Sequence, residues 1–471
     1  YLEKDDRVYW ITQDVNSLSL LGFFDKVYTV SSQMGFEALL LGKKVVCFGM
    51  PFYAGWGLTE DRVDCSRREK GLSLLELFCG AYIKYCRYLD PKTGKRGTIF
   101  DVIEFILRQR EWAEKVGRFN YYCVDFHIAR KSYVKPFLNT KNNEVYFIKS
   151  KDIPNLSFSE RDVLVVWGSK SRRRIEDVIK GALKILTVED GFIRSYGLGA
   201  DFVPPMSLVF DSRGIYYDPS CESDLEYLLN NHHFSEEELE EAERIRKLIV
   251  NHDITKYNLR SEKELKVSTD KRVLLVIGQV EDDEAVLLSG GDIKTNLQLL
   301  KRVRGENPDS YILFKPHPDT LSKNRRGYRL DTFQEWADRI ELEADIIDSI
   351  KVADEVHVLT SLSGFEALIR NKKVFTYGAP FYAGWGLTQD YVVPPRRRRR
   401  LTLQELIAGA LILYPVYYDW MLKGFVDCKT VINRIVYQRL KNKLQLRANL
   451  PRPLKKLVNY TNFILWRLSL K

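Results

Sequence analysis

The sequence of 471 residues is too long for one ordinary hydrophobic core, and 45% hydrophobic with 12% aromatic residues is the composition of a globular protein. Its seven scattered cysteines include no CxxC pair, which argues against a disulfide framework and against a zinc site. There is no run of eighteen apolar residues and no signal pattern. We therefore expect a cytoplasmic protein that does not span a membrane.

One long string occurs twice. PFYAGWGLT covers 51–59 and again 380–388, and at the same offset of 329 residues GFEALLLGKKV at 35–45 aligns with GFEALIRNKKV at 364–374. Because this period is far longer than that of a stacked repeat, we predict the duplication of a whole module. The chain does not start with Met, and residues 1–118 are expected to hold only the end of a first module.

From residue 119 onward, short apolar runs alternate with helical patterns. Each run reaches a polar or glycine-containing turn, as parallel strands joined by helices do. The expected strands are DVLVVWG (162–168), KILTVED (184–190), RVLLVIG (272–278), YILFKPH (311–317), EVHVLTS (355–361) and KVFTYG (373–378). The fold class is therefore α/β, with two doubly wound, Rossmann-like halves at 119–265 and 266–425 that face each other across a cleft.

Two motifs follow strands of these halves. Glu189 and Asp190 end the strand 184–190, at the edge where open α/β sheets place ligands, although Asp-Gly is also an ordinary turn. In KPHPD, the flanking prolines restrict the direction of His317, and Lys315 adds a cation beside it. This pair suits an anionic ligand such as a nucleotide phosphate, and a structural histidine is the alternative.

The segment TSLSGFEAL joins a strand end to a helix start. Its hydroxyls and the free N–H groups of the helix would form a natural phosphate seat. A capping box between Ser363 and Glu366 is the alternative interpretation. The first copy keeps Glu37 but has Met34 in place of the capping serine, so Glu366 is expected to have another task.

The segment GQVEDD follows the strand 272–278. It places Gln279, Asp282 and Asp283 at a strand end, where a rigid element can hold a carboxylate in fixed geometry for chemistry. Solvated surface acids are the alternative.

In combination these motifs resemble those of a known family. Glu-Asp-Gly, His-Pro and Ser/Thr motifs in this order are similar to those of transferases that use CMP-activated keto sugars, including bacterial sialyltransferases. GQVEDD, SGFEAL, PFYAGWGLT and VEDGFIRSYGLG at 188–199 resemble more specifically the KpsC-type capsule polysaccharide β-Kdo transferases. This similarity covers nearly the whole chain.

The resemblance implies a GT-B-like architecture and transfer of Kdo from CMP-Kdo to a β-Kdo linker on a lyso-phosphatidylglycerol anchor. It implies no further cofactor, and no metal is expected. The donor-binding residues would be Gln279, Lys315, His317, Pro318, Ser361, Ser363, Gly364 and Glu366. Glu189, Arg194, Tyr382 and Trp385 would lie on the acceptor side or along the cleft.

Donor and product share the β configuration in this family, so the resemblance implies retention through an enzyme-bound ester. Asp283 is the first choice for the nucleophile and Asp282 the second, with Asp190 as a third catalytic carboxylate near the acceptor. Residues 1–118 lack counterparts of these motifs, so we expect a single active centre within 119–425. The alternatives are an inverting, sialyltransferase-like enzyme and a capsule assembly scaffold that binds nucleotide or glycan without releasing CMP.

The end of the chain, 426–471, is strongly basic. After Asp427 there are eleven lysines and arginines and no acidic residue, with aromatic residues near the end. This composition predicts an amphipathic tail that binds the anionic surface of the inner membrane, with a solvated charged helix as the alternative. Nucleic acid is disfavoured because RNA-type aromatic motifs are absent. Other capsule assembly proteins are further candidate partners.

Overall fold

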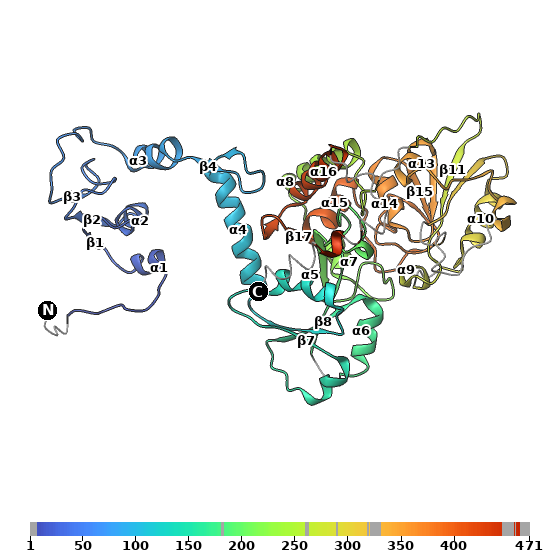
Figure 1. Ribbon diagram of the computed structural model, residues 1–471, viewed down its shortest axis with the longest axis horizontal. Coiled ribbons are helices and arrows are strands. Elements are labelled where there is room, and N and C mark those ends of the chain that lie inside the picture. Colours follow the sequence, from blue (N-terminus) through green and yellow to red (C-terminus); the bar gives the residue numbers. More distant parts are fainter. Residues whose placement is uncertain are drawn as a thin grey trace. The chain divides into compact units, whose positions relative to one another are not determined.

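The computed structural model describes residues 7–179, 183–259, 263–288, 291–317, 320, 331–444, 456 and 458–461. The chain divides into two compact units, 1–106 and 107–471 (Figure 1).

The first unit contains a small parallel sheet in the order β1-β2-β3. Its elements are α1 Ser17–Leu21, β1 Lys26–Thr29, α2 Met34–Leu40, β2 Lys44–Cys47, β3 Glu60–Asp61, α3 Leu74–Phe78, η1 Cys79–Tyr85, β4 Tyr88–Leu89 and β5 Arg96–Gly97. Phe36, Val45 and Tyr53 belong to its core. Helix α4, Ile99–Val116, begins in this unit and continues into the second.

The second unit has two halves, each built on its own sheet. The first half has seven strands in the order β18-β17-β10-β9-β8-β6-β7, and β9, β8, β6 and β7 run parallel. Its elements up to residue 251 are β6 Asn120–Val124, α5 Ile128–Leu138, β7 Val145–Ile148, η2 Ser150–Asn155, β8 Asp162–Trp167, α6 Gly168–Glu176, β9 Lys184–Asp190, η3 Gly199–Asp201, β10 Ser207–Asp211, α7 Asp224–Asn231 and α8 Glu236–Asn251.

The second half is a six-stranded, fully parallel sheet in the order β13-β12-β11-β14-β15-β16. Its elements are β11 Val273–Ile277, α9 Glu284–Leu287, α10 Asn296–Glu306, β12 Tyr311–Lys315, α12 Asp331–Gln334, β13 Arg339–Ile340, α13 Ile346–Val352, β14 Glu355–Val358, α14 Leu362–Ile369, β15 Lys373–Thr376 and β16 Gln389–Asp390. Every residue of β11 and β14 is buried, as expected for central strands covered on both faces. The α/β prediction with parallel sheets is confirmed.

The end of the chain corrects the expected division of the two halves. After α15 Leu403–Ile407 and η4 Ala408–Leu413, the strands β17 Pro415–Asp419 and β18 Gly424–Val426 extend the sheet of the first half, although the sequence placed them in the second. They pair antiparallel beyond β10, which would otherwise be an open edge. Helix α16, Cys428–Leu444, then packs on α8 with Val431 and Ile432 fully buried. The predicted free tail therefore cannot begin before residue 445.

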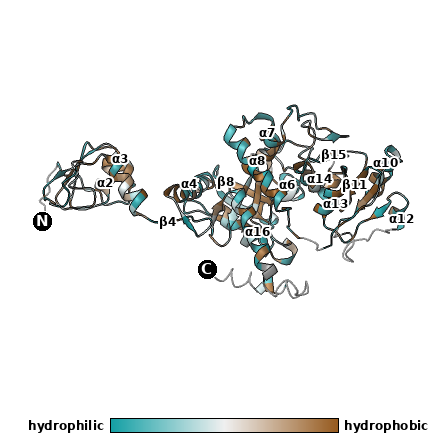
Figure 2. Ribbon diagram, turned by 90° about the horizontal axis from the view of Figure 1, so that it is seen from above, coloured by the Kyte–Doolittle hydropathy of each residue, from teal (hydrophilic) through white to brown (hydrophobic). Residues whose placement is uncertain are grey.

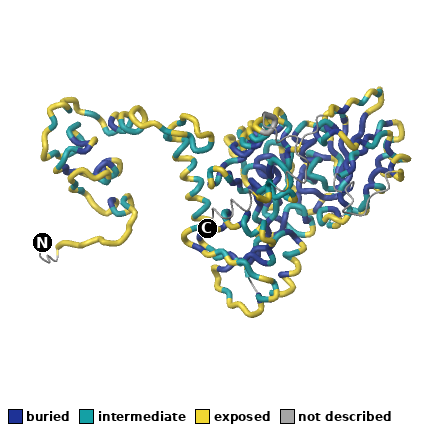
Figure 3. The backbone as a smooth tube through the Cα atoms, viewed as in Figure 1, coloured by how far each residue is buried: buried dark blue, intermediate teal, exposed yellow. Residues whose placement is uncertain are grey.

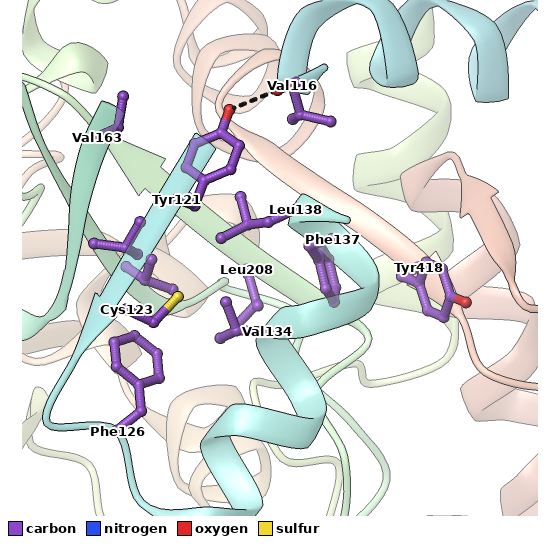
Figure 4. Close-up of a cluster of buried hydrophobic side chains, with 12 residues drawn as sticks. Val116, Tyr121, Cys123, Phe126, Val134, Phe137, Leu138, Val163, Leu208 and Tyr418 are labelled. Carbon is purple, nitrogen blue, oxygen red and sulfur yellow. Dashed lines mark hydrogen bonds between the residues drawn. The ribbon is translucent and has the colours of Figure 1, made fainter. Parts of the chain in front are cut away.

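Each half has its own hydrophobic core. Apolar side chains follow the central strands, and buried positions concentrate in the second unit (Figures 2 and 3). In the first half, Val134, Phe137 and Leu208 pack together with Tyr121, whose hydroxyl donates to the carbonyl of Val116 at 3.1 Å (Figure 4). These cores fix the strand ends from which the polar side chains of the cleft project.

The two copies of the repeated string fold alike but differ in burial. Strands β1, β2 and β3 start 329 positions before β14, β15 and β16 and pair in the same register. Tyr28 is 63% exposed and Phe48 is 52% exposed, whereas their counterparts His357 and Tyr377 are 1% and 2% exposed. The difference arises because β14 also pairs with β11, while β1 is an edge strand. The duplication itself stays a prediction.

This contrast predicts different local stability at matched positions. Backbone amides of β1 and β2 should exchange with solvent faster than those of β14 and β15, because edge strands with few buried neighbours open more easily. Hydrogen exchange measured by mass spectrometry would compare the two copies within one molecule. Equal protection would show that the exposed face of β1 is covered in solution.

Candidate active site between the two halves

Asp190 ends β9 in a strongly fixed geometry. Its Oδ2 accepts a hydrogen bond from Arg194 Nε at 2.7 Å, whereas its Oδ1 is buried and has no hydrogen-bond partner among the described residues. Arg194 is only 4% exposed and also donates to Ser195 Oγ and to the carbonyl of Val203, both at 2.9 Å. The ion pair therefore holds one carboxylate oxygen and leaves the other available.

Glu189 lies beside it in a different environment. Its Oε1 accepts from the indole Nε1 of Trp167 at 3.2 Å and from the backbone N of Asp190 at 3.0 Å. Burial raises the pKa of Glu189 to about 7, and the negative charge of Asp190 adds to this, while Lys256 opposes it. The strand end thus carries a carboxyl group that can exchange a proton near neutral pH.

Lys256 connects the two halves of the cleft. Its carbonyl accepts from Arg194 N at 3.0 Å, and its backbone N donates to Glu366 Oε1 at 3.3 Å. Burial alone lowers the pKa of the Lys256 ammonium, but the charges of the neighbouring tyrosines and of Asp190 and Glu189 outweigh this and raise it. The ammonium is therefore a permanent positive charge among the acidic groups. No sequence pattern marked this residue, because it lies in an irregular segment.

Glu366 of α14 faces the first half and does not form the capping box considered above. The N-cap of α14 is Ser361, whose hydroxyl accepts from Ser363 N at 3.2 Å. Burial raises the pKa of Glu366 to about 7, while Arg370 and the hydrogen bond from Lys256 N oppose this rise. The expected additional task of Glu366 thus includes a bond across the cleft.

Tyr382 and Trp385 support α14 from beneath. The Tyr382 hydroxyl donates to the carbonyl of Ser361 at 2.5 Å, and a Cβ on Gly364 would lie 2.2 Å from that hydroxyl oxygen. Trp385 Nε1 donates to the carbonyl of Phe381 at 2.8 Å. Both aromatic side chains are fully buried. They were expected to border the cleft, but full burial gives them a packing role and no surface for a ligand.

The remaining donor-side candidates follow β11 and β12. Gln279 ties two strand ends together, because its Oε1 accepts from Thr360 N at 2.7 Å. Lys315 ends β12, and burial lowers the pKa of its ammonium, opposed by Glu341 and Asp345. His317 is partly exposed, and its carbonyl accepts from Thr320 N at 3.0 Å. Pro318 lies outside the described residues.

Asp283 and Asp282 are both exposed. Asp283 is the N-cap of the short helix α9, where its Oδ1 accepts from Ala285 N at 3.0 Å. The next residue, Glu284, which the sequence interpretation passed over, faces the first half. Its Oε2 accepts from Ser169 Oγ at 2.8 Å.

A small apolar pocket lies between the halves next to Glu366. Its walls are Phe192, Ile193, Ile249, Ile254, Thr255, Leu362, Phe365, Ile369 and Leu411. Within the described residues, no group of three or more His, Cys, Asp or Glu side chains is arranged to hold a metal ion. None of the helices described is both long enough and apolar enough to cross a bilayer.

The pKa of Glu366 predicts a specific pH dependence of stability. The folded state holds this proton up to about pH 7, whereas the unfolded chain releases it near 4.5, so the stability of the fold decreases as pH rises through this window. Glu366→Gln should flatten that decrease, measured as melting temperature between pH 5 and 8. Glu37→Gln is the matched control in the first copy. An unchanged slope in Glu366→Gln would contradict the raised pKa.

Comparison with solved structures defines the fold class. The chain is 36% identical to the structure titled KpsC, beta Kdo 2,7 transferase, from Thermosulfurimonas dismutans, with a TM-score of 0.55 over 68% of this chain and 99% of that one. It is 32% identical to the beta Kdo 2,4 transferase of the same organism, with a TM-score of 0.57 over 67% and 97% of the two chains. The fold is therefore GT-B-like.

Sequence comparison shows the family. The family model described as capsule polysaccharide biosynthesis protein matches residues 1–88 and 162–417, and the chain belongs to this family. It is 42% identical over 446 residues to the capsule polysaccharide modification protein LipA of Neisseria meningitidis serogroup A, which covers 93% of this chain and 63% of LipA. The lipopolysaccharide-processing protein LpsZ of Rhizobium meliloti is 40% identical over 283 residues, which cover 58% of this chain and 64% of LpsZ. The chain thus spans less than two thirds of the length of these relatives.

Proposed function

We propose that the second unit is a glycosyltransferase that moves Kdo from CMP-Kdo, with retention of configuration, onto a β-Kdo linker of a lyso-phosphatidylglycerol anchor in capsule biosynthesis. The observation that carries this proposal is the buried Asp190 carboxylate, fixed by Arg194 on one oxygen and without a partner on the other. The family membership and the similarity to two Kdo transferases support Kdo as the sugar.

In the first step of the proposed reaction, Asp190 Oδ1 attacks the anomeric carbon of Kdo. The bond from that carbon to the CMP phosphate oxygen breaks, CMP leaves with the electron pair, and an ester joins Kdo to Asp190. Lys315, His317 and the N-terminal turn of α14 would stabilise the charge that develops on the phosphate. These groups all follow strands of the second half, where we propose that the donor binds.

In the second step, a hydroxyl of the acceptor attacks the same carbon from the vacated face. Its proton passes to the Glu189 carboxylate, and the ester bond breaks to release Asp190. Two inversions give net retention. Glu189 suits this role because its pKa of about 7 lets it accept a proton near neutral pH and release it again. The neighbouring carboxyls thus take different roles because their environments differ.

Asp190 replaces Asp283 as the first candidate for the nucleophile. Asp283 is exposed and its carboxylate caps α9, whereas Asp190 is held by a buried cation at the end of a central strand. Chemistry requires a carboxylate with a fixed direction, and Asp190 meets this requirement better. Asp283 and Asp282 stay as the rival candidates.

Replacing Asp190 by Asn should reduce Kdo transfer by roughly three orders of magnitude or more, because the nucleophile is lost. CMP binding, measured by calorimetry, should be retained, and without acceptor the wild type should accumulate a Kdo adduct on the peptide that contains Asp190. Loss of transfer in Asp283→Asn with activity retained in Asp190→Asn would assign the nucleophile to Asp283. CMP release with CMP-sialic acid in place of CMP-Kdo would favour the sialyltransferase-like alternative, and CMP binding without release would favour a scaffold.

The linkage that is formed needs its own measurement. The 2,7 transferase has the higher sequence identity to this chain, while the 2,4 transferase has the higher TM-score. Linkage analysis of the product made on a synthetic Kdo acceptor would decide between the two positions.

We further propose that the protein acts in the cytoplasm, attached peripherally to the inner membrane through residues 445–471. This segment carries six lysines and arginines and no acidic residue. Attraction to anionic lipid is worth about 1 kcal/mol for each well-placed cation. Where the structure describes the segment, Tyr460 stacks on Phe202 at 5.1 Å between ring centroids, and Asn459 Nδ2 donates to the carbonyl of Asp201 at 3.1 Å.

Removal of residues 445–471 should abolish cosedimentation with vesicles that contain anionic lipid, and added salt should weaken the binding of the full chain. The cut preserves α16, whose buried residues a truncation at 429 would remove. Neutral vesicles serve as the control. Equal sedimentation of the shortened and full chains would refute the role of the segment.

A further inference from the structure

Glu284 is a carboxylate of the second half that caps a helix of the first. Its Oε2 accepts from Ser169 Oγ at 2.8 Å, from Lys170 N at 3.3 Å and from Tyr217 Oη at 3.3 Å. Its Oε1 lies 3.7 Å from a guanidinium nitrogen of Arg173. All four of these partners belong to the first half, so one side chain bridges the cleft.

The helix that receives Glu284 has no local cap. The N-cap residue of α6 is Trp167, whose side chain makes no capping hydrogen bond. The first N–H groups of a helix have no partner inside the helix and attract negative charge. Tyr217 Oη accepts from Ser169 N at 3.0 Å, and Glu284 accepts from the next N–H. The first turn of α6 is therefore completed by the other half.

This turn also determines where Glu189 lies. Trp167, directly before α6, donates through its indole to Glu189 Oε1. Gly168 has a φ of +75°, and a Cβ built there would lie 3.7 Å from both Glu189 Oε2 and Glu284 Oε2. The carboxylates of Glu189 and Glu284 thus approach the same glycine, one from each half.

The opposite side of the second unit is joined by different contacts. There Glu226 of α7 pairs with Arg396 Nε at 2.6 Å and with Arg397 Nε at 3.0 Å, and Arg397 is buried. Figure 1 shows α8 and α16 on the upper side of this unit and α6 and α9 on its lower side. The Glu226 contacts are buried, whereas the side chain of Glu284 is 29% exposed. A partly exposed contact of one carboxylate is the easier one to open.

We propose that Glu284 is a positioning residue that holds the two halves closed on the α6 side of the cleft. In the closed arrangement it fixes the first turn of α6, and through Trp167 it fixes the Glu189 carboxylate beside Asp190. Breaking the contact lets the halves separate for the entry of substrate and the exit of product. The catalytic consequence rests on the proposed function, but the contact and the closure do not.

The first test needs no substrate. In Glu284→Gln, the amide of Lys170 should exchange with solvent about tenfold faster, because a charge-assisted hydrogen bond becomes a weaker neutral one. The radius of gyration from small-angle scattering should increase. Glu240→Gln, which makes the same charge change on an exposed face of α8, should alter neither quantity. Wild-type exchange and scattering in Glu284→Gln would overturn the proposal.

The second test separates positioning from general destabilisation. Glu284→Gln should lower kcat about tenfold while CMP affinity, measured by calorimetry, stays unchanged, because the proposed CMP-binding groups lie entirely in the second half. Ser169→Ala should have a similar effect, and the double variant should be no worse than the more severe single one. Fully additive effects would overturn the proposal. Faster exchange in Glu284→Gln together with no Kdo transfer by the wild type would refute the proposed function and leave the closure intact.

Discussion

The buried guanidinium of Arg194 is the interaction on which the arrangement of the cleft depends. A cation removed from water must be paired, and Arg194 takes Asp190 as its counterion and the carbonyl of Val203 as a further acceptor. Its own backbone N and C=O bond to Lys256 and Met206, which lie in two other segments. One residue therefore places the acidic strand end and the segment that carries the lysine. Losing it would leave a buried carboxylate without compensation, at a cost of about 3–5 kcal/mol.

Much of the fold could be predicted from the sequence, because the strands of the second half are continuous apolar runs ended by polar turns. The return of β17 and β18 could not, because PVYYD is a clear strand pattern but a pattern does not name its partner. Only the open edge of β10 in three dimensions determines that these residues leave the half that precedes them in the chain.

The candidate site was predictable where a residue follows a strand directly, as for Glu189 and Asp190. Glu366 was singled out because its first-copy counterpart lacks a capping partner, and the structure gives it a bond from Lys256 N. Lys256 and Glu284 were missed for physical reasons. The first lies in an irregular segment without periodicity, and the second is one acid in a run whose members differ only in the direction of their side chains.

The edge of the seven-stranded sheet is closed in an economical way. Gln109 of α4 donates through Nε2 to the carbonyl of Phe425 and accepts through Oε1 from the N–H of the same residue, both at 2.7 Å. A single amide side chain thus imitates a neighbouring strand at the end of β18. Exposed edges are the places where sheets of separate molecules join into aggregates. The colloidal behaviour of this protein at high concentration therefore depends on one glutamine far from the cleft.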